Sequence, residues 1–408
     1  MECFRCQGRL YQKPLVCGKK VCPIYSKVNL FKSQKLTKKD FMATAPGVFV
    51  GRHSYPDINV GIISPPEQVD QAQLYESPKE WVSRGLNIPE IVDFRSVLIN
   101  SKFKANVKLK SKMLNMSQEV AMASKPVDLE FNLIKKPFYF YKTSNIESPM
   151  GATASLKKVS ITENIKIDRR VDYIVNDVDL KSMYGLKDLY DRGYDENFLT
   201  KLLSVGNLGL KKDRKLVPTR WSITAVDDTL GKKMIEEVKD YKESDFKLFF
   251  GGTFGNYYLI MFFPRVWSYE LFEMYMPKGL LNPSENIEVM TDHEFYDGRK
   301  KYAENCVGGY YACRLSILEK LREMKRQAMV VTLRFITDEY TTPLGVWVCR
   351  ESTRKALNHS WDFDSKEEMV KFAGSLVFDK FGFDITNTMK QSKLYAYMNT
   401  QKTLFEFW

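Results

Sequence analysis

The sequence predicts a mixed α/β protein that carries a small zinc-ribbon-like module at its N-terminus. Segments with helical spacing alternate with short apolar runs, and glycine and proline turns separate them. The chain has 408 residues, of which 44% are hydrophobic and 13% aromatic, enough for a substantial core in two or three domains. We expect a ribbon-like module at 1–30, a mixed α/β core at 31–400 with room for two subdomains, and a separate tail at 401–408. The topology of the core does not follow from the sequence.

Four of the seven cysteines lie in the first 22 residues and form a metal-binding pattern. The pairs Cys3-x-x-Cys6 and Cys17-x4-Cys22 are separated by ten residues, a spacing typical of a zinc ribbon in which four thiolates surround one ion. Such a module is too small for a core of its own, so bound metal would supply its folding free energy. We predict structural zinc, with an iron–sulfur cluster or a redox switch as alternatives. The module either contacts nucleic acid or covers the neighbouring domain.

The other cysteines, Cys306, Cys313 and Cys349, lie in apolar surroundings and are expected to be buried thiols. The N-terminus does not have the pattern of a signal peptide, and no apolar stretch is long enough to cross a bilayer. We therefore expect a soluble cytoplasmic protein without a membrane partner, whose thiols are reduced or metal-bound.

The sequence of the first part of the core predicts β-strands. The run 46–51 opens a glycine-punctuated strand, and 60–63 is a second strand that two prolines end. Residues 101–112 alternate, which would place a row of lysines on one face of a strand. These are Lys102, Lys104, Lys108, Lys110 and Lys112. We interpret the row as a solvated face, with a track for phosphates as the alternative.

The second part of the core mixes helices and strands. Helical spacing predicts helices within 178–204, 228–241, 300–327 and 365–380. Apolar runs at 247–250 and 257–263 flank a glycine-rich turn and predict a hairpin. The turn is not predicted to be a P-loop, because the Gly-Lys-Ser/Thr that a P-loop requires does not follow it. The runs 329–336 and 346–349 are predicted as buried strands.

The charge of the chain favours a polyanionic partner. The net charge is +12 and the sequence pI is about 9.1, which suits nucleic acid, a nucleotide or an anionic membrane surface. The polar segment 214–228 offers Arg214, Lys215 and Arg220 as phosphate-binding groups. Arg52 and His53, directly after the glycine-punctuated strand, are further candidates for binding phosphate or nucleic acid.

Acidic residues and a histidine are the candidates for catalysis. Asp227 and Asp228 could hold a divalent metal in the core, and His293 lies in a second polar segment, 292–299. If these segments met the basic residues in space, they would form a site for metal-assisted phosphoryl hydrolysis. The alternative is a set of helix caps and buried ion pairs.

The segment 401–408 has the spacing of a partner-binding peptide. Leu404, Phe407 and Trp408 lie at i, i+3 and i+4, so one helical turn places them on a single face. Gln401, one turn earlier, can form hydrogen bonds beside that face. The pattern resembles the peptide box with which replication and repair proteins bind the sliding clamp, PCNA. The alternative is a tail that folds back onto its own domain.

Several segments together resemble the archaeal Nre family of DNA-repair proteins, over nearly the whole chain. They are the four-cysteine ribbon, the runs 46–56, 214–228, 292–299 and 308–311, and the terminal box. The resemblance implies a DNA-repair or damage-response protein that the clamp recruits. By the same resemblance, the clamp-binding residues are Gln401, Leu404, Phe407 and Trp408, and the ribbon cysteines are Cys3, Cys6, Cys17 and Cys22. It implies no catalytic residue.

Two hypotheses therefore remain. In the first, the protein is a clamp-recruited repair factor whose basic core binds DNA or a nucleotide without chemistry. In the second, it is a clamp-recruited enzyme that hydrolyses a nucleotide or a phosphodiester with the help of a metal, through Asp227, Asp228 and His293.

Overall fold

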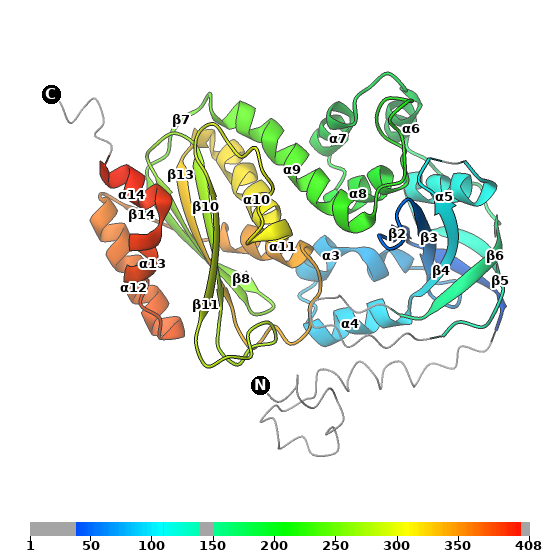
Figure 1. Ribbon diagram of the computed structural model, residues 1–408, viewed down its shortest axis with the longest axis horizontal. Helices are drawn as coiled ribbons and strands as arrows, with labels where there is room; N and C mark the ends of the chain where they lie inside the picture. Colours follow the sequence, from blue (N-terminus) through cyan, green and yellow to red (C-terminus); the bar gives the residue numbers. More distant parts are fainter. Residues whose placement is uncertain (1–37, 109, 139–150, 401–408) are drawn as a thin grey trace, which may run out of the picture. The chain divides into compact units, whose positions relative to one another are not determined.

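The computed structural model describes residues 38–108, 110–138 and 151–400 (Figure 1). The ribbon cysteines and the segment 401–408 lie outside these ranges. The chain divides into two compact units: residues 1–230 with 342–345, and residues 231–341 with 346–408. Each unit is built on a six-stranded sheet with helices around it. The mixed α/β prediction is therefore confirmed for the described residues.

The first unit contains a mostly antiparallel sheet in the order β1-β5-β6-β4-β3-β2, in which β4 and β6 are the one parallel pair. Its strands are β1 (Asp40–Ala45), β2 (Gly47–Val50), β3 (Asp57–Ser64), β4 (Ile99–Asn106), β5 (Val127–Leu133) and β6 (Thr153–Ile161). Its helices are η2 (Ala72–Glu76), α3 (Pro78–Ser83), α4 (Ile88–Val97), α5 (Lys112–Met122), α6 (Arg169–Asn176), α7 (Ser182–Asp191) and α8 (Glu196–Ser204).

The strand alternation of the first unit decides which side chains form its core. Val48 and Val50 of β2, and Val60 and Ile62 of β3, point to the buried face, because successive side chains of a strand lie on opposite faces. Leu114 of α5 joins the same cluster. The two strands expected at 46–51 and 60–63 are therefore confirmed as β2 and β3.

The predicted strand at 101–112 is only half correct. β4 ends at Asn106, so Lys102 and Lys104 lie on the strand while the later lysines do not. The Ser111 side chain accepts a hydrogen bond from Leu114 N at 3.2 Å and starts α5. A helix N-cap of this kind ends the extended conformation, so the five lysines do not form one continuous stripe.

The second unit contains a sheet in the order β11-β10-β13-β9-β8-β14, in which β10 and β13 are parallel and the other pairs antiparallel. Its strands are β8 (Phe246–Thr253), β9 (Asn256–Phe263), β10 (Ser268–Tyr275), β11 (Glu288–Glu294), β13 (Met329–Ile336) and β14 (Ser360–Phe363), with a separate parallel pair β7 (Lys242–Glu243) and β12 (Arg326–Gln327). Its helices are α10 (Val307–Met324), α11 (Trp347–Ala356), α12 (Lys366–Phe381), α13 (Thr386–Gln391) and α14 (Lys393–Thr400). A further helix, α9 (Thr219–Val238), begins in the first unit and ends in the second.

The second unit is a three-layer sandwich. α10 and α11 lie on one face of its sheet, and α12, α13 and α14 lie on the other (Figure 1). Alternate residues of the strands, such as Leu259, Phe272 and Leu333, pack against Met369 and Val377 of α12. The remaining strand residues face α10 and α11, and polar side chains are among them.

Several predictions for the second unit are confirmed, and one is wrong. β8 and β9 form the expected hairpin through Phe254 and Gly255, whose φ angles of 54° and 69° suit a tight two-residue turn. The run 329–336 is β13, and 365–380 corresponds to α12. The run 346–349 is not a strand but enters helix α11. Four apolar residues are too few for their period to distinguish a strand from a helix.

Candidate functional site

Three distant parts of the first unit meet at one exposed surface: the turn after β2, the segment after β4 and the residues that enter α9. Val107 N donates to Pro56 O at 3.0 Å, and Leu216 N donates to Val107 O at 2.9 Å. Val50 N donates to Thr219 Oγ1 at 2.9 Å. Because hydrogen bonds connect all three segments, their side chains are presented together.

An aromatic pair lies on this surface. The Tyr55 and Trp221 rings are 5.7 Å apart between centroids and tilted by 45°. Their exposed fractions are 45% and 48%. Each ring therefore leaves apolar area in water, where it is accessible to a planar ligand.

The same three segments also carry exposed basic side chains. They are Arg52 and His53, Lys108, Lys215 and Arg220. Within the described parts of the chain, none of these cations forms an ion pair with a carboxylate. The nearest carboxylates along these segments are Asp57, which accepts a hydrogen bond from Asn106 Nδ2 at 2.8 Å, and Asp213. We refer to Arg52, His53, Tyr55, Lys108, Lys215, Arg220 and Trp221 as the basic-aromatic surface.

Arg214 does not belong to this surface. Its Nε donates to Gly209 O at 2.8 Å and its Nη2 donates to Asp177 O at 3.1 Å. Burial lowers the pKa of Arg214 from its ordinary value, and the Asp177 charge opposes that shift. The side chain therefore holds the loop before α9 together, whereas the adjacent Lys215 faces solvent.

Asp227 and Asp228 are residues of a helix and not of a polar loop. The segment expected to be irregular at 214–228 becomes α9 from Thr219 onward. Asp227 is buried and Asp228 half-buried. Neighbouring residues of a helix project about 100° apart, so these two carboxylates do not face one another.

The described residues contain no group of three or more His, Cys, Asp or Glu side chains that could hold a metal ion. This result concerns groups of three or more ligands, so the divalent metal predicted in the core stays a prediction. The four ribbon cysteines lie outside the described ranges, so this result does not bear on the zinc prediction.

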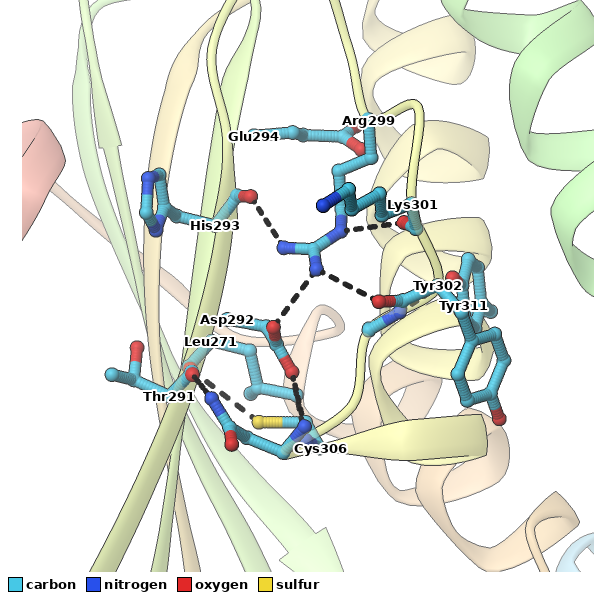
Figure 2. Close-up of polar contacts among 12 residues, drawn as sticks. Leu271, Thr291, Asp292, His293, Glu294, Arg299, Lys301, Tyr302, Cys306 and Tyr311 are labelled. Atoms are coloured by element: carbon cyan, nitrogen blue, oxygen red, sulfur yellow. Dashed lines mark hydrogen bonds and ion pairs between the residues drawn. The ribbon is translucent and has the colours of Figure 1, made fainter.

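In the second unit, Asp292 holds the entry to α10 (Figure 2). Its Oδ2 accepts hydrogen bonds from Asn305 N at 3.0 Å and Cys306 N at 2.8 Å. Its Oδ1 is 3.0 Å from Arg299 Nη2. Arg299 also donates to His293 O at 2.7 Å and Tyr302 O at 3.1 Å. These contacts tie the loop before the helix to strand β11.

Because side chains alternate along a strand, His293 lies on the opposite face of β11 from Asp292 and Glu294. Figure 2 shows the His293 ring directed away from Arg299, and the ring packs against Phe295 at 5.4 Å. Glu294 lies again on the α10 side, where its Oε2 is 2.8 Å from Nη1 of the buried Arg314. In the segment 292–299, the polar contacts are those of a helix entry and a buried ion pair.

The sequence contained a signal for the aromatic part of the surface that our prediction did not use. Tyr55 lies two residues after His53, and Trp221 directly follows Arg220. Aromatic residues next to basic ones are typical of nucleic-acid-binding segments. The interpretation of Lys108 as part of a solvated row depends on a continuous strand through 101–112, whereas β4 ends at Asn106.

The described ranges contain no helix that is both long and apolar enough to span a membrane. The fold and site define a protein of two mixed α/β units with an exposed basic and aromatic surface in the first. The N-terminal model of the archaeal Nre family matches residues 16–282, and its C-terminal model matches residues 294–407. This chain belongs to the archaeal Nre family.

Curated relatives are similar along most of the chain. The DNA repair protein NreB of Archaeoglobus fulgidus is 35% identical over 412 residues, which cover 100% of both chains. The DNA repair protein NreA of the same organism is 34% identical over 93% of this chain and 95% of its own length. The DNA repair protein NreA of Haloferax volcanii is 35% identical over 76% of each chain. No solved structure matches this chain.

Proposed function

We propose that this protein acts in DNA repair or the DNA damage response and is recruited to DNA by the sliding clamp, PCNA. The observation that carries the proposal is the 35% identity with the DNA repair protein NreB over the full length of both chains. Similarity confined to one unit would support only a shared fold. Similarity across both units and the flanking segments supports a shared role.

The clamp contact is assigned to the segment 401–408. Helix α14 ends at Thr400, and the C-terminal family model extends to residue 407. In this proposal Leu404, Phe407 and Trp408 enter a hydrophobic groove of the clamp, and Gln401 reaches a polar pocket beside it. A short peptide loses conformational entropy on binding, so we expect micromolar affinity, about −8 kcal/mol.

A structural zinc ion is assigned to Cys3, Cys6, Cys17 and Cys22. The segment 1–37 also contains eight basic residues and one acidic residue, so it contributes +7 of the net charge of +12. The N-terminal family model begins at residue 16 and includes the second cysteine pair. The charge supports a second point of attraction to DNA beside the zinc module.

The basic-aromatic surface is assigned to DNA binding in the first unit. Its cations come from three segments that backbone hydrogen bonds hold together, and they make no ion pair with a described carboxylate. Unpaired, exposed cations gathered at one place are suited to phosphate groups of a nucleic acid backbone.

Calorimetric titration with the cognate clamp tests the recruitment. The full chain should bind, and a chain that lacks 401–408 should not. Alanine at Phe407 or Trp408 should each cost roughly 2 kcal/mol or more, because central aromatic residues dominate such interfaces. Lys402→Ala is the matched control and should bind as the full chain does. Equal affinity of the shortened and full chains would remove the clamp contact from this segment.

A further inference from the structure

We propose that Tyr55 and Trp221 form a stacking platform for unpaired bases, so that the basic-aromatic surface binds single-stranded DNA in preference to duplex DNA. This inference rests on the proposed DNA-binding role and adds the form of DNA that the surface recognises. It concerns the first unit alone and is independent of clamp binding.

The two rings are available for stacking. Each ring remains nearly half exposed although the two are in contact at 5.7 Å. Other aromatic residues of this unit are either completely buried, as Trp81 and Phe131 are, or exposed elsewhere, as Tyr173 and Tyr184 are; Tyr55 and Trp221 are exposed and also in contact with each other. An exposed ring can stack on any base that is not already stacked on adjacent bases. The bases of a duplex are already stacked on one another, so the same rings gain little from duplex DNA.

The charges around the rings are arranged for the backbone of such a strand. Arg52 lies in the turn that carries Tyr55, and Arg220 directly precedes Trp221. Lys108 follows Val107, which is bonded to both of the other segments. The segments that carry the two rings, and the segment bonded to both of them, therefore also carry cations for the phosphates of such a strand. Aromatic rings interleaved with cations are the common arrangement in proteins that bind single strands.

The platform is held in place before any ligand arrives. Val50 N at the start of the turn is bonded to Thr219 Oγ1, and Gly51 N donates to Asn59 O at 2.8 Å. At the end of the turn, Pro56 O accepts from Val107 N at 3.0 Å. Because both ends of the turn are fixed, stacking requires little additional ordering of the protein.

Fluorescence anisotropy with the full-length protein tests the inference. The probes are labelled oligodeoxythymidine of about 12 nucleotides, a duplex of equal length, and single-stranded RNA of the corresponding sequence. The wild-type protein should bind the DNA strand more tightly than the duplex. Trp221→Ala should weaken single-strand binding roughly tenfold, the factor expected for the loss of one stacked base, and leave duplex binding nearly unchanged. Tyr55→Ala should act in the same direction.

Two further variants separate stacking from loss of structure. Trp221→Phe keeps an aromatic ring and should retain most of the single-strand affinity. Trp361→Ala removes a tryptophan of the second unit with an exposed fraction of 39% and should have no effect. Quenching of tryptophan fluorescence by the oligonucleotide should be smaller in Trp221→Phe than in the wild-type protein.

Equal affinity for the strand and the duplex, together with no effect of Trp221→Ala, would overturn the inference. In that case salt-sensitive binding to both forms would leave the proposed DNA-binding role intact. Tighter binding to the RNA than to the DNA strand would overturn the assignment to DNA. Absence of binding to every probe at low salt would remove both the inference and the DNA-binding role.

Discussion

Gly309 of α10 lies directly against the carboxylate of Glu273 on β10. A Cβ atom added to Gly309 would fall 2.6 Å from Glu273 Oε1 and 3.3 Å from Arg334 Nη1. Glu273 forms a buried ion pair with Arg334 and accepts a hydrogen bond from Tyr275 Oη at 2.7 Å. The helix approaches the sheet closely enough to cover this pair only because residue 309 has no side chain.

Gly309→Ala should therefore destabilise the second unit. The methyl group would displace one member of a buried ion pair, and overpacking of this kind typically costs about 1–3 kcal/mol. Gly374→Ala is the matched control: Gly374 lies in α12, and its added Cβ would meet only Ile385 Cγ1 at 3.9 Å. That change should stabilise the protein by up to about 1 kcal/mol, because alanine is the better helix former. Chemical denaturation measures the free energy of unfolding of both variants, and a Gly309→Ala protein as stable as the wild type would contradict the prediction.

Thiol titration should distinguish the buried cysteines from the proposed zinc ligands. Cys306, Cys313 and Cys349 are buried and free. Burial raises the pKa of Cys313 to about 12 and also raises the pKa of the other two thiols, because the thiolate loses its hydration. Since the thiolate is the reactive form, these three should not react in the folded protein near pH 8.

With zinc bound, the folded protein should show almost no reactive thiol. Addition of a strong chelator should release one zinc per chain and expose the remaining four of the seven cysteines. Full denaturation should then expose all seven. Four reactive thiols before any chelator is added, in protein purified without one, would argue against a bound metal.

Arg220→Ala should weaken DNA binding more than Lys104→Ala. Arg220 belongs to the basic-aromatic surface, whereas Lys104 lies on β4 outside it. Loss of one phosphate contact should lower the slope of log affinity against log salt by roughly 1. Equal effects of the two substitutions would point to diffuse attraction and not to a site. Measurements of affinity at several salt concentrations provide the comparison.

The sequence was sufficient for features that depend on neighbouring residues. β13 and the β8–β9 hairpin follow from a continuous apolar run and from glycine-containing turn chemistry. α12 begins where Ser365 accepts a hydrogen bond from Glu368 N at 3.2 Å and ends at Gly382, whose φ is 63°. Helix caps, turns and hydrophobic periodicity depend on residues a few positions apart, so they can be predicted from the sequence without knowledge of the fold.

Only the tertiary structure decided which polar residues share a surface. Arg214 and Lys215 are adjacent and both basic, yet the first is bonded to two backbone carbonyls and the second faces solvent. Tyr55 meets Trp221 because β2, β4 and the start of α9 are brought together by hydrogen bonds between distant residues. Such contacts depend on packing across the whole unit, and a one-dimensional pattern does not contain them.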